Sequence, residues 1–248
     1  STNSLGKYYP TFADVCREVD AYIDSSDYSA DTRGDYKGSL KTRLESMTNG
    51  ISKLLFCNGS VPDEELFDSR VIADLSRVGS AENKALIMGI LVIKLQEHRM
   101  CQRTISNEAL KHITVLEEAH NLLRNGQTTF GEMNGGIASK SVEMISNAIA
   151  EMRTYGEGFV IVDQSPGLLD MAAIRNTNTK IIMRLPDESD RQLVGKAACL
   201  NNGQIAELAK LQRGIAAVYQ NEWIQPVLCK VEKVEHDSNT FQNTFVGS

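Results

Sequence analysis

The chain has 248 residues, of which 42% are hydrophobic and 23% charged, and its formal net charge at pH 7 is −6. This size fits one large α/β domain, or one domain with a smaller lobe. The acidic balance excludes a protein coated with basic surface, although a local basic patch would still allow nucleic-acid binding. The longest apolar stretch, Ala85 to Ile93, is far shorter than the roughly 20 residues that span a bilayer, so we expect no membrane insertion.

The cysteines are scattered, odd in number and free of any C-x-x-C pair: Cys16, Cys57, Cys101, Cys199 and Cys229. This pattern favours reduced thiols and gives no indication of a zinc site. The N-terminal residues are polar and show no signal-peptide pattern. We therefore expect a cytoplasmic protein.

The N-terminal quarter of the chain has helical periodicity. Apolar residues recur at helical spacing from residue 12 to residue 23 and again from residue 40 to residue 54, so residues 9–56 are expected to be mostly helical. A polar stretch rich in Ser and Asp, residues 24–35, is expected to be a loop, and residues 57–65 form a second break. We assign residues 1–66 to a helical lobe.

From Arg70 onward the pattern changes to alternating strands and helices. Strands are expected at 70–76, 112–120, 158–166, 179–185, 215–220 and 225–232, and helices at 80–100, 141–156, 189–200 and 203–214. Residues 125–140 are expected to be a loop, Gly156 a helix stop, and Asp187 an N-cap with Asp190 three residues later. The alternation predicts an α/β fold, with a mostly parallel, buried sheet and flanking helices over residues 67–248.

Polar residues follow two of these strands at the edge where parallel sheets carry their functional groups. Glu117 and Glu118 end the strand "ITVLEE", and two adjacent carboxylates repel each other unless a cation or a group of donors shares them. One explanation is a Mg²⁺ ion held with a phosphate, while the second acid polarises a water molecule. The other is a solvated pair at a helix start. Gln164 ends the next strand, where its amide would bridge a water and a phosphate or simply form a turn.

Three further side chains are weaker candidates. Arg153 follows an amphipathic helix and Arg184 lies at the end of a strand, and an arginine fork matches phosphate oxygens. Each is also an ordinary surface ion-pair residue. His120 is expected to begin a helix. It is a weak candidate for a metal ligand, because no second histidine is spaced for a shared metal.

Three segments together resemble the HerA/FtsK-type branch of P-loop ATPases: "ITVLEEAHNLL", "IAEMRTYGEGFVIVDQSPGLLD" and "NTNTKIIMRLPDESDRQLVG". The resemblance covers about residues 70–227. It implies a RecA-like sheet and a DNA-pumping motor such as a HerA-like helicase or a conjugative-transfer ATPase. It also implies ATP and Mg²⁺ as cofactors and double-stranded DNA as partner. The working form that it implies is a homo-oligomeric ring, with a hexamer as the expected size, together with a nuclease partner.

The resemblance assigns roles to the candidate residues. Glu117 matches the Mg²⁺-organising acid of the Walker B element, Glu118 the catalytic base and Gln164 the polar sensor. Arg153 and Arg184 each match a position from which an arginine finger would reach a neighbouring subunit, and the sequence does not choose between them.

One family motif is missing. The phosphate-binding loop G-x-x-x-x-G-K-[ST] does not occur, and its nearest candidate, "NSLGKYY", has Gly6 and Lys7 followed by Tyr8. We therefore expect the C-terminal part of a longer ATPase that is inactive by itself. In the family the loop's strand lies between the sensor strand (158–162 here) and the strand around Ile181. Its loss predicts a directly closed gap, a strand borrowed from a second copy, or a shifted sheet.

Two other functions remain open at this stage. A binding or regulatory module would keep the fold with a decayed nucleotide site. A carboxylate-dependent nuclease would need Asp163 to join Glu117 and Glu118 on one metal, although alternation along the strand directs Asp163 away from Gln164. Basic side chains that would face DNA, or simply form a solvated helix face, are Lys37, Lys41, Arg43, Arg99 and Arg103.

Overall fold

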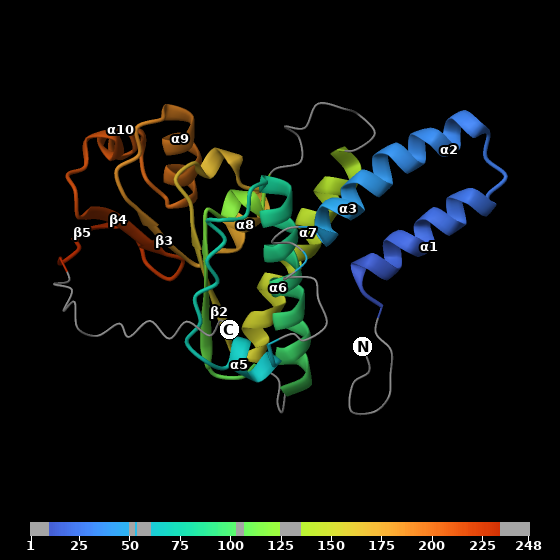
Figure 1. The fold of residues 1–248 in the computed structure, drawn as a ribbon. Helices are drawn as coiled ribbons and strands as arrows, with labels where there is room; N and C mark the ends of the chain where they lie inside the picture. Colours follow the sequence, from blue (N-terminus) through green and yellow to red (C-terminus); the bar gives the residue numbers. More distant parts are fainter. Residues whose placement is uncertain (1–9, 50–52, 54–60, 103–106, 125–134, 234–248) are drawn as a thin grey trace. The chain divides into compact units, whose positions relative to one another are not determined.

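The computed structural model describes residues 10–49, 53, 61–102, 107–124 and 135–233 (Figure 1). The chain separates into two compact units, Ser1–Gly79 and Ser80–Ser248, and each is described by itself. Within the described ranges, no helix has both the length and the apolar character needed to cross a membrane. The sequence motif around Gly6 and Lys7, the side chain of Cys57 and that of Arg103 lie outside the described residues.

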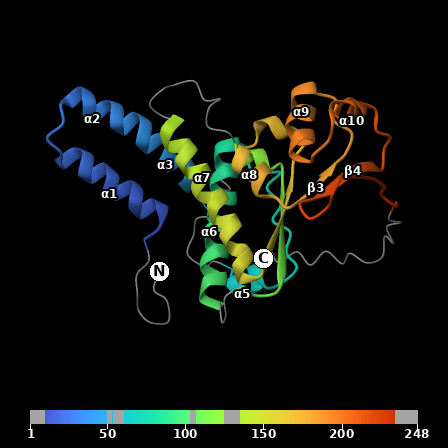
Figure 2. The same cartoon turned by 180° about the vertical axis from the view of Figure 1, so that it is seen from behind.

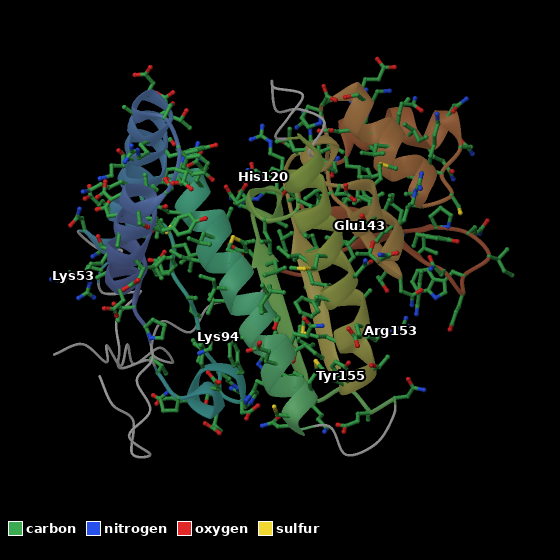
Figure 3. The ribbon with its side chains drawn as sticks, turned by 90° about the vertical axis from the view of Figure 1, so that its right-hand side faces the viewer. Lys53, Lys94, His120, Glu143, Arg153 and Tyr155 are labelled. Atoms are coloured by element: carbon green, nitrogen blue, oxygen red, sulfur yellow. The ribbon has the colours of Figure 1, made fainter. Side chains whose placement is uncertain are left out.

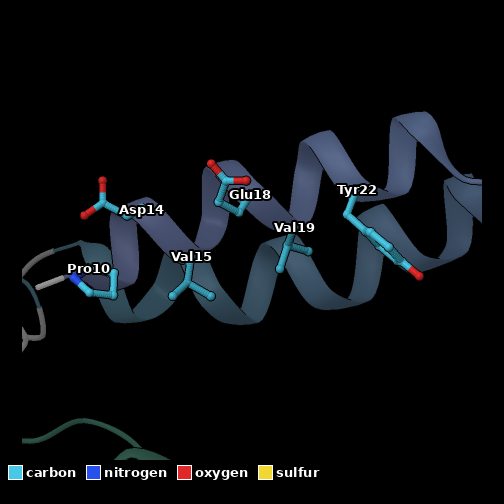
Figure 4. Close-up of a pocket in the computed structure, with 6 residues that line it drawn as sticks. All are labelled: Pro10, Asp14, Val15, Glu18, Val19 and Tyr22. Atoms are coloured by element: carbon cyan, nitrogen blue, oxygen red, sulfur yellow. The ribbon is translucent and has the colours of Figure 1, made fainter.

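The first unit is helical, as its periodicity predicts. Its elements are α1 (Phe12–Ser25), α2 (Ala30–Tyr36), the π-helical turn η1 (Lys37–Lys41), α3 (Thr42–Thr48) and α5 (Asp63–Phe67). Thr11 and Asp14 form a capping box that begins α1. An ion pair of 2.9 Å between Lys41 Nζ and Asp20 Oδ2 joins η1 to α1. On α1 an apolar stripe edged by acids lines a shallow depression (Figure 4), formed by Pro10, Asp14, Val15, Glu18, Val19 and Tyr22.

Two predictions for this unit are wrong. The expected loop over residues 24–35 contains the start of α2, because the Ser29 hydroxyl accepts a hydrogen bond from Thr32 N and caps a polar helix. The expected strand over residues 70–76 is not a strand. Ile72 in that segment is 87% exposed, and an alternating apolar pattern forms a strand only where a neighbouring strand pairs with it.

The second unit holds all the strands among the described residues. Its helices are α6 (Ala81–Gln102), η2 (Ala119–Asn121), α7 (Gly135–Met152), η4 (Arg153–Tyr155), η5 (Pro166–Leu168), α8 (Met171–Asn176), α9 (Glu188–Ala197), α10 (Asn202–Glu207) and η6 (Leu208–Lys210). Its strands are β1 (His112–Glu117), β2 (Glu157–Val162), β3 (Thr179–Ile182), β4 (Ile215–Gln220) and β5 (Val227–Lys230). Helix α7 begins inside the segment that was expected to be a loop up to residue 140.

The strands form two sheets rather than one. β1 and β2 pair in parallel, while β3, β4 and β5 form a separate antiparallel sheet. The prediction of a mostly parallel sheet therefore holds for β1 and β2 and is wrong for the C-terminal strands. β4 and β5 are joined by a short turn that reverses the chain, while α9, α10 and η6 lie between β3 and β4. Among the described residues β2 pairs only with β1, and β3 only with β4. Direct closure of the gap between the sensor strand and β3 is thus not observed.

Only one face of the β1–β2 pair is covered. Helices α6 and α7 lie side by side along it (Figures 1 and 2), and Leu116 on that face is buried. Because paired residues of parallel strands share a face, the alternate residues form the other one. That outer face is apolar but exposed, and its members are Ile113 (51%), Val115 (56%), Val160 (46%) and Val162 (43%). The expectation of strands buried on both faces is therefore wrong for the described residues.

The antiparallel sheet has a core of its own under α9 and α10. Its buried members are Ile182, Ala198, Leu208 and Ala217. The predicted N-cap of α9 is confirmed, since Asp187 Oδ1 accepts from Asp190 N at 2.9 Å. Hydrogen bonds from Ser189 and the Asp190 N–H hold the pKa of Asp187 below its usual value.

Gly156 ends the α7–η4 segment, as predicted, in the left-handed conformation with φ of +83°. A Cβ atom at this position would lie 2.5 Å from the backbone oxygen of Ala109. We expect Gly156→Ala to lower the free energy of unfolding by at least about 1–2 kcal/mol, since the left-handed conformation alone costs an L-residue that much. Urea denaturation measures this difference. In the control Gly89→Ala, the added methyl group makes ordinary contacts inside helix α6. It should leave stability unchanged or raise it by up to about 1 kcal/mol.

Candidate active site

The parallel pairing of β1 and β2 brings their carboxyl ends to one edge of the sheet. Glu117 is the last residue of β1 and pairs with Val162, the last residue of β2. Glu117 is exposed and belongs to the outer face of the strand pair. The next residue, Glu118, leaves the strand in the left-handed conformation with φ 49° and ψ 48°. Such a conformation is strained for a residue with a side chain and occurs often at functional sites.

Glu118 and Gln164 meet across the two strand ends. Gln164 Nε2 donates a hydrogen bond of 2.8 Å to Glu118 Oε1. The Glu118 side chain remains 47% exposed, so its carboxylate is open to solvent and to a ligand. The structure therefore brings together the acid and the amide that the sequence singles out, at the edge where parallel α/β sheets bind ligands.

His120 and Asp163 form a second contact beside the first. Asp163 Oδ2 accepts from the His120 backbone N at 2.7 Å and lies 2.9 Å from His120 Nδ1. Asp163 Oδ1 accepts from Ser165 N at 2.8 Å, and the carboxylate is 3% exposed. The sequence pattern indicates a helix start at His120 and does not predict this contact. Asp163 contacts His120 while Gln164 contacts Glu118, and both residues follow the end of β2 at Val162.

This geometry does not bring a third acid to the Glu117–Glu118 pair. Both oxygens of Asp163 are occupied by N–H donors. Within the described part of the chain, no group of three metal-ligating side chains is assembled. The exposed adjacent carboxylates do fit Mg²⁺ as it occurs in phosphate sites, where one or two protein carboxylates act with waters and phosphate oxygens.

The two candidate arginines lie in different places. Arg153 is exposed in η4, immediately before β2, and so lies at the end of the strand opposite to Gln164. Figure 3 shows His120 and Arg153 near opposite ends of the sheet. Arg184 is exposed after β3, and its Nε donates to Ala209 O at 3.1 Å. A hydrogen bond of 2.9 Å from Gly167 N to Asp190 Oδ1 joins the segment after β2 to helix α9.

The basic residues proposed to face DNA are mostly engaged elsewhere. Arg99 is 5% exposed, and its Nε donates to Glu157 Oε2 at 2.8 Å, so an interface role for Arg99 is wrong. Lys37 pairs with Asp24 at 2.6 Å, and Lys41 pairs with Asp20. These contacts give no support to a DNA interface through Arg99, Lys37 or Lys41.

The most informative comparison by fold is a solved VirB4 structure from Thermoanaerobacter pseudethanolicus. It matches 94% of this chain and 58% of that one, with a TM-score of 0.61 and 13% sequence identity. At this identity the match shows the fold alone. The chain thus has a mixed α/β fold similar to that of VirB4, with a parallel strand pair and covering helices.

Comparisons by sequence give closer relatives. The DNA double-strand break repair helicase HerA of Sulfurisphaera tokodaii is 24% identical over 207 residues. The HerA protein of Sulfolobus acidocaldarius is 29% identical over 124 residues. The matches cover 82% and 50% of this chain but only 40% and 23% of those proteins. No family model matches. The chain is related to the HerA/VirB4-like P-loop ATPases.

Proposed function

We propose that this chain carries the water-activating half of a HerA-like, ATP-hydrolysing DNA motor. The observation that carries the proposal is the 2.8 Å hydrogen bond between Gln164 and Glu118, beside Glu117, at the joined ends of two parallel strands. Phosphoryl transfer to water requires three groups from a protein at this edge: a base, a sensor amide and an acid that holds the metal.

The chemistry follows from the exposure of each group. Glu118 keeps one carboxylate oxygen hydrogen-bonded to Gln164 and is half exposed, so it can accept a proton from a water that attacks phosphorus. Gln164 orients Glu118 and would contact the transferred phosphate. Glu117 would hold Mg²⁺, which when bound neutralises phosphate charge.

We further propose that the phosphate-binding strand and loop occupy the space between β2 and β3. The support is that each of these strands has one edge without a strand partner among the described residues. Backbone groups on such edges favour pairing with another strand. The proposal also agrees with the limited share of the HerA relatives that the chain matches.

The partners follow from the same relationship. The curated relatives are named as DNA repair helicases, so we propose double-stranded DNA as the track and a homo-oligomeric ring as the working form. Arg153 precedes β2, whereas Glu117 and Glu118 lie at the opposite end of the strand pair. Arg153 would therefore contact the phosphate only in the site of a neighbouring subunit. Arg184 remains the alternative finger.

Calorimetric titration with Mg²⁺-ATP tests the proposal. The titration is made on the 248-residue chain, on the protein at its full natural length, and on the Glu118→Gln variant of each. We expect no measurable binding to the 248-residue chain and binding to the full-length protein, with Glu118→Gln binding as tightly as the parent because the substitution leaves the hydrogen bond with Gln164 possible.

Two outcomes would contradict parts of the proposal. Tight binding to the 248-residue chain would show a phosphate cradle within it and remove the need for an added strand. Failure of the full-length protein to bind or hydrolyse ATP would reject the motor and favour a binding or regulatory module on the same fold.

A further inference from the structure

We propose that His120 is a positioning residue for Glu118, held in place by the buried carboxylate of Asp163. The inference deepens the proposed function and rests on it, because it concerns the orientation of the acid that would activate water. It assigns a role to a histidine that the sequence pattern alone treats as a helix start.

The first step is the anchoring of the imidazole. Asp163 is 3% exposed and receives N–H groups from the His120 backbone, the His120 ring and the Ser165 backbone. Asp163 Oδ2 already accepts the His120 backbone N–H, and we take it as the acceptor of the ring contact as well. His120 Nδ1 then carries the hydrogen that it donates across 2.9 Å. The ring therefore has a fixed tautomer and a fixed plane.

The second step links this ring to the candidate base. The same Nδ1 lies 3.5 Å from Glu118 Oε2, while Gln164 Nε2 donates to Glu118 Oε1 at 2.8 Å. The Glu118 carboxylate thus accepts a hydrogen bond on Oε1 from the residue after β2, and its Oε2 lies beside the imidazole edge of the segment after β1. Rotation of the carboxylate away from this position would lose both contacts.

The third step is the reason why Glu118 needs such support. Its backbone is left-handed, and its carbonyl oxygen accepts from Asn121 Nδ2 and Asn121 N, both at 2.9 Å. The backbone is fixed, but a half-exposed glutamate side chain has several rotamers of similar energy. Catalysis depends on placement within a fraction of an ångström, and a misplacement of about 1 Å lowers rates about 100-fold.

The kinetic test compares two substitutions in the protein at its full natural length. His120→Ala removes the ring and its donor. His120→Asn places an amide N–H near the position of Nδ1 and can reach Asp163. We expect His120→Ala to lower kcat for ATP hydrolysis about 10- to 100-fold with little change in KM, and His120→Asn to restore most of the loss.

A residue that only tied the two strand ends together would give a different result. His120→Ala would then lower thermal stability and the active fraction, without a selective loss of kcat in the folded enzyme. An unchanged kcat, a loss confined to KM, or an asparagine variant as slow as the alanine variant would each overturn the proposal.

A second measurement needs no activity. The imidazole resonances of His120 are recorded by NMR in the 248-residue chain, with Glu118→Gln and with the control Glu207→Gln, whose partner is Lys210. We expect a hydrogen on Nδ1, displaced resonances in Glu118→Gln and none in the control. Insensitivity of His120 to Glu118→Gln would refute the positioning contact. Absence of ATP hydrolysis in the parent protein, with the NMR result intact, would instead reject the proposed function.

Discussion

Replacing Arg99 with alanine is expected to lower the free energy of unfolding of the second unit by about 3–5 kcal/mol. Arg99 in α6 and Glu157 at the start of β2 form an ion pair whose side chains are 5% and 0% exposed. Glu157 Oε1 also accepts from Thr114 Oγ1 at 2.7 Å and lies 2.8 Å from His112 Nδ1. Without Arg99, the carboxylate would stay buried without its strongest partner, which costs far more than the loss of an exposed ion pair.

Urea denaturation at 25 °C and neutral pH measures the loss from the transition midpoint and slope. The matched control is Lys210→Ala, which removes an ion pair with Glu207 whose side chains are 71% and 64% exposed. Lys210→Ala should change the free energy of unfolding by no more than about 0.5 kcal/mol. An Arg99→Ala variant as stable as the control would mean that water replaces the guanidinium at no cost, and the buried network would not be a stabilising element.

Glu118→Gln is expected to lower kcat for ATP hydrolysis by about 100- to 10,000-fold, the range that a positioned general base contributes. The amide keeps the shape of the side chain and can still accept from Gln164, so binding of nucleotide should change little. What it loses is the ability to take a proton from water. Steady-state hydrolysis by the full-length protein, at saturating Mg²⁺-ATP, measures the effect.

The control for this substitution is Glu143→Gln, on the exposed side of α7, which should hydrolyse ATP at the parent rate. A Glu118→Gln variant with more than about a tenth of the parent kcat would exclude Glu118 as the base. Glu117, the other acid of the adjacent pair, would then be the candidate base.

The regular elements of the second unit were predictable because each is decided by local pattern. The apolar run of α6, the β-branched strands β1 and β2 and the Asp187 cap all follow from residues within the element itself. The strand expected at residues 70–76 failed for the opposite reason. Pairing with a neighbour decides whether such a segment becomes a strand, and no local pattern reports that neighbour.

The candidate site was predictable in part. Strand ends of a parallel pair meet at one edge, which brought Glu118 and Gln164 together as expected. The contact of His120 with Asp163 was missed because His120 was considered only as a helix start or a metal ligand, and Asp163 only as a third acid on a metal. The same rule of meeting strand ends, applied to every polar residue after each strand, would have indicated that contact.

The arrangement of the sheets has a mechanical consequence. No strand-to-strand hydrogen bond joins β2 to β3 among the described residues, and the antiparallel sheet has its own core. The two sheets are joined by contacts of α9 with α8 and η5, including the bond from Gly167 to Asp190. Such a joint resists shear much less than a continuous ladder of backbone bonds. A strand seated between β2 and β3 would extend the backbone ladder across the joint and stiffen the second unit against shear.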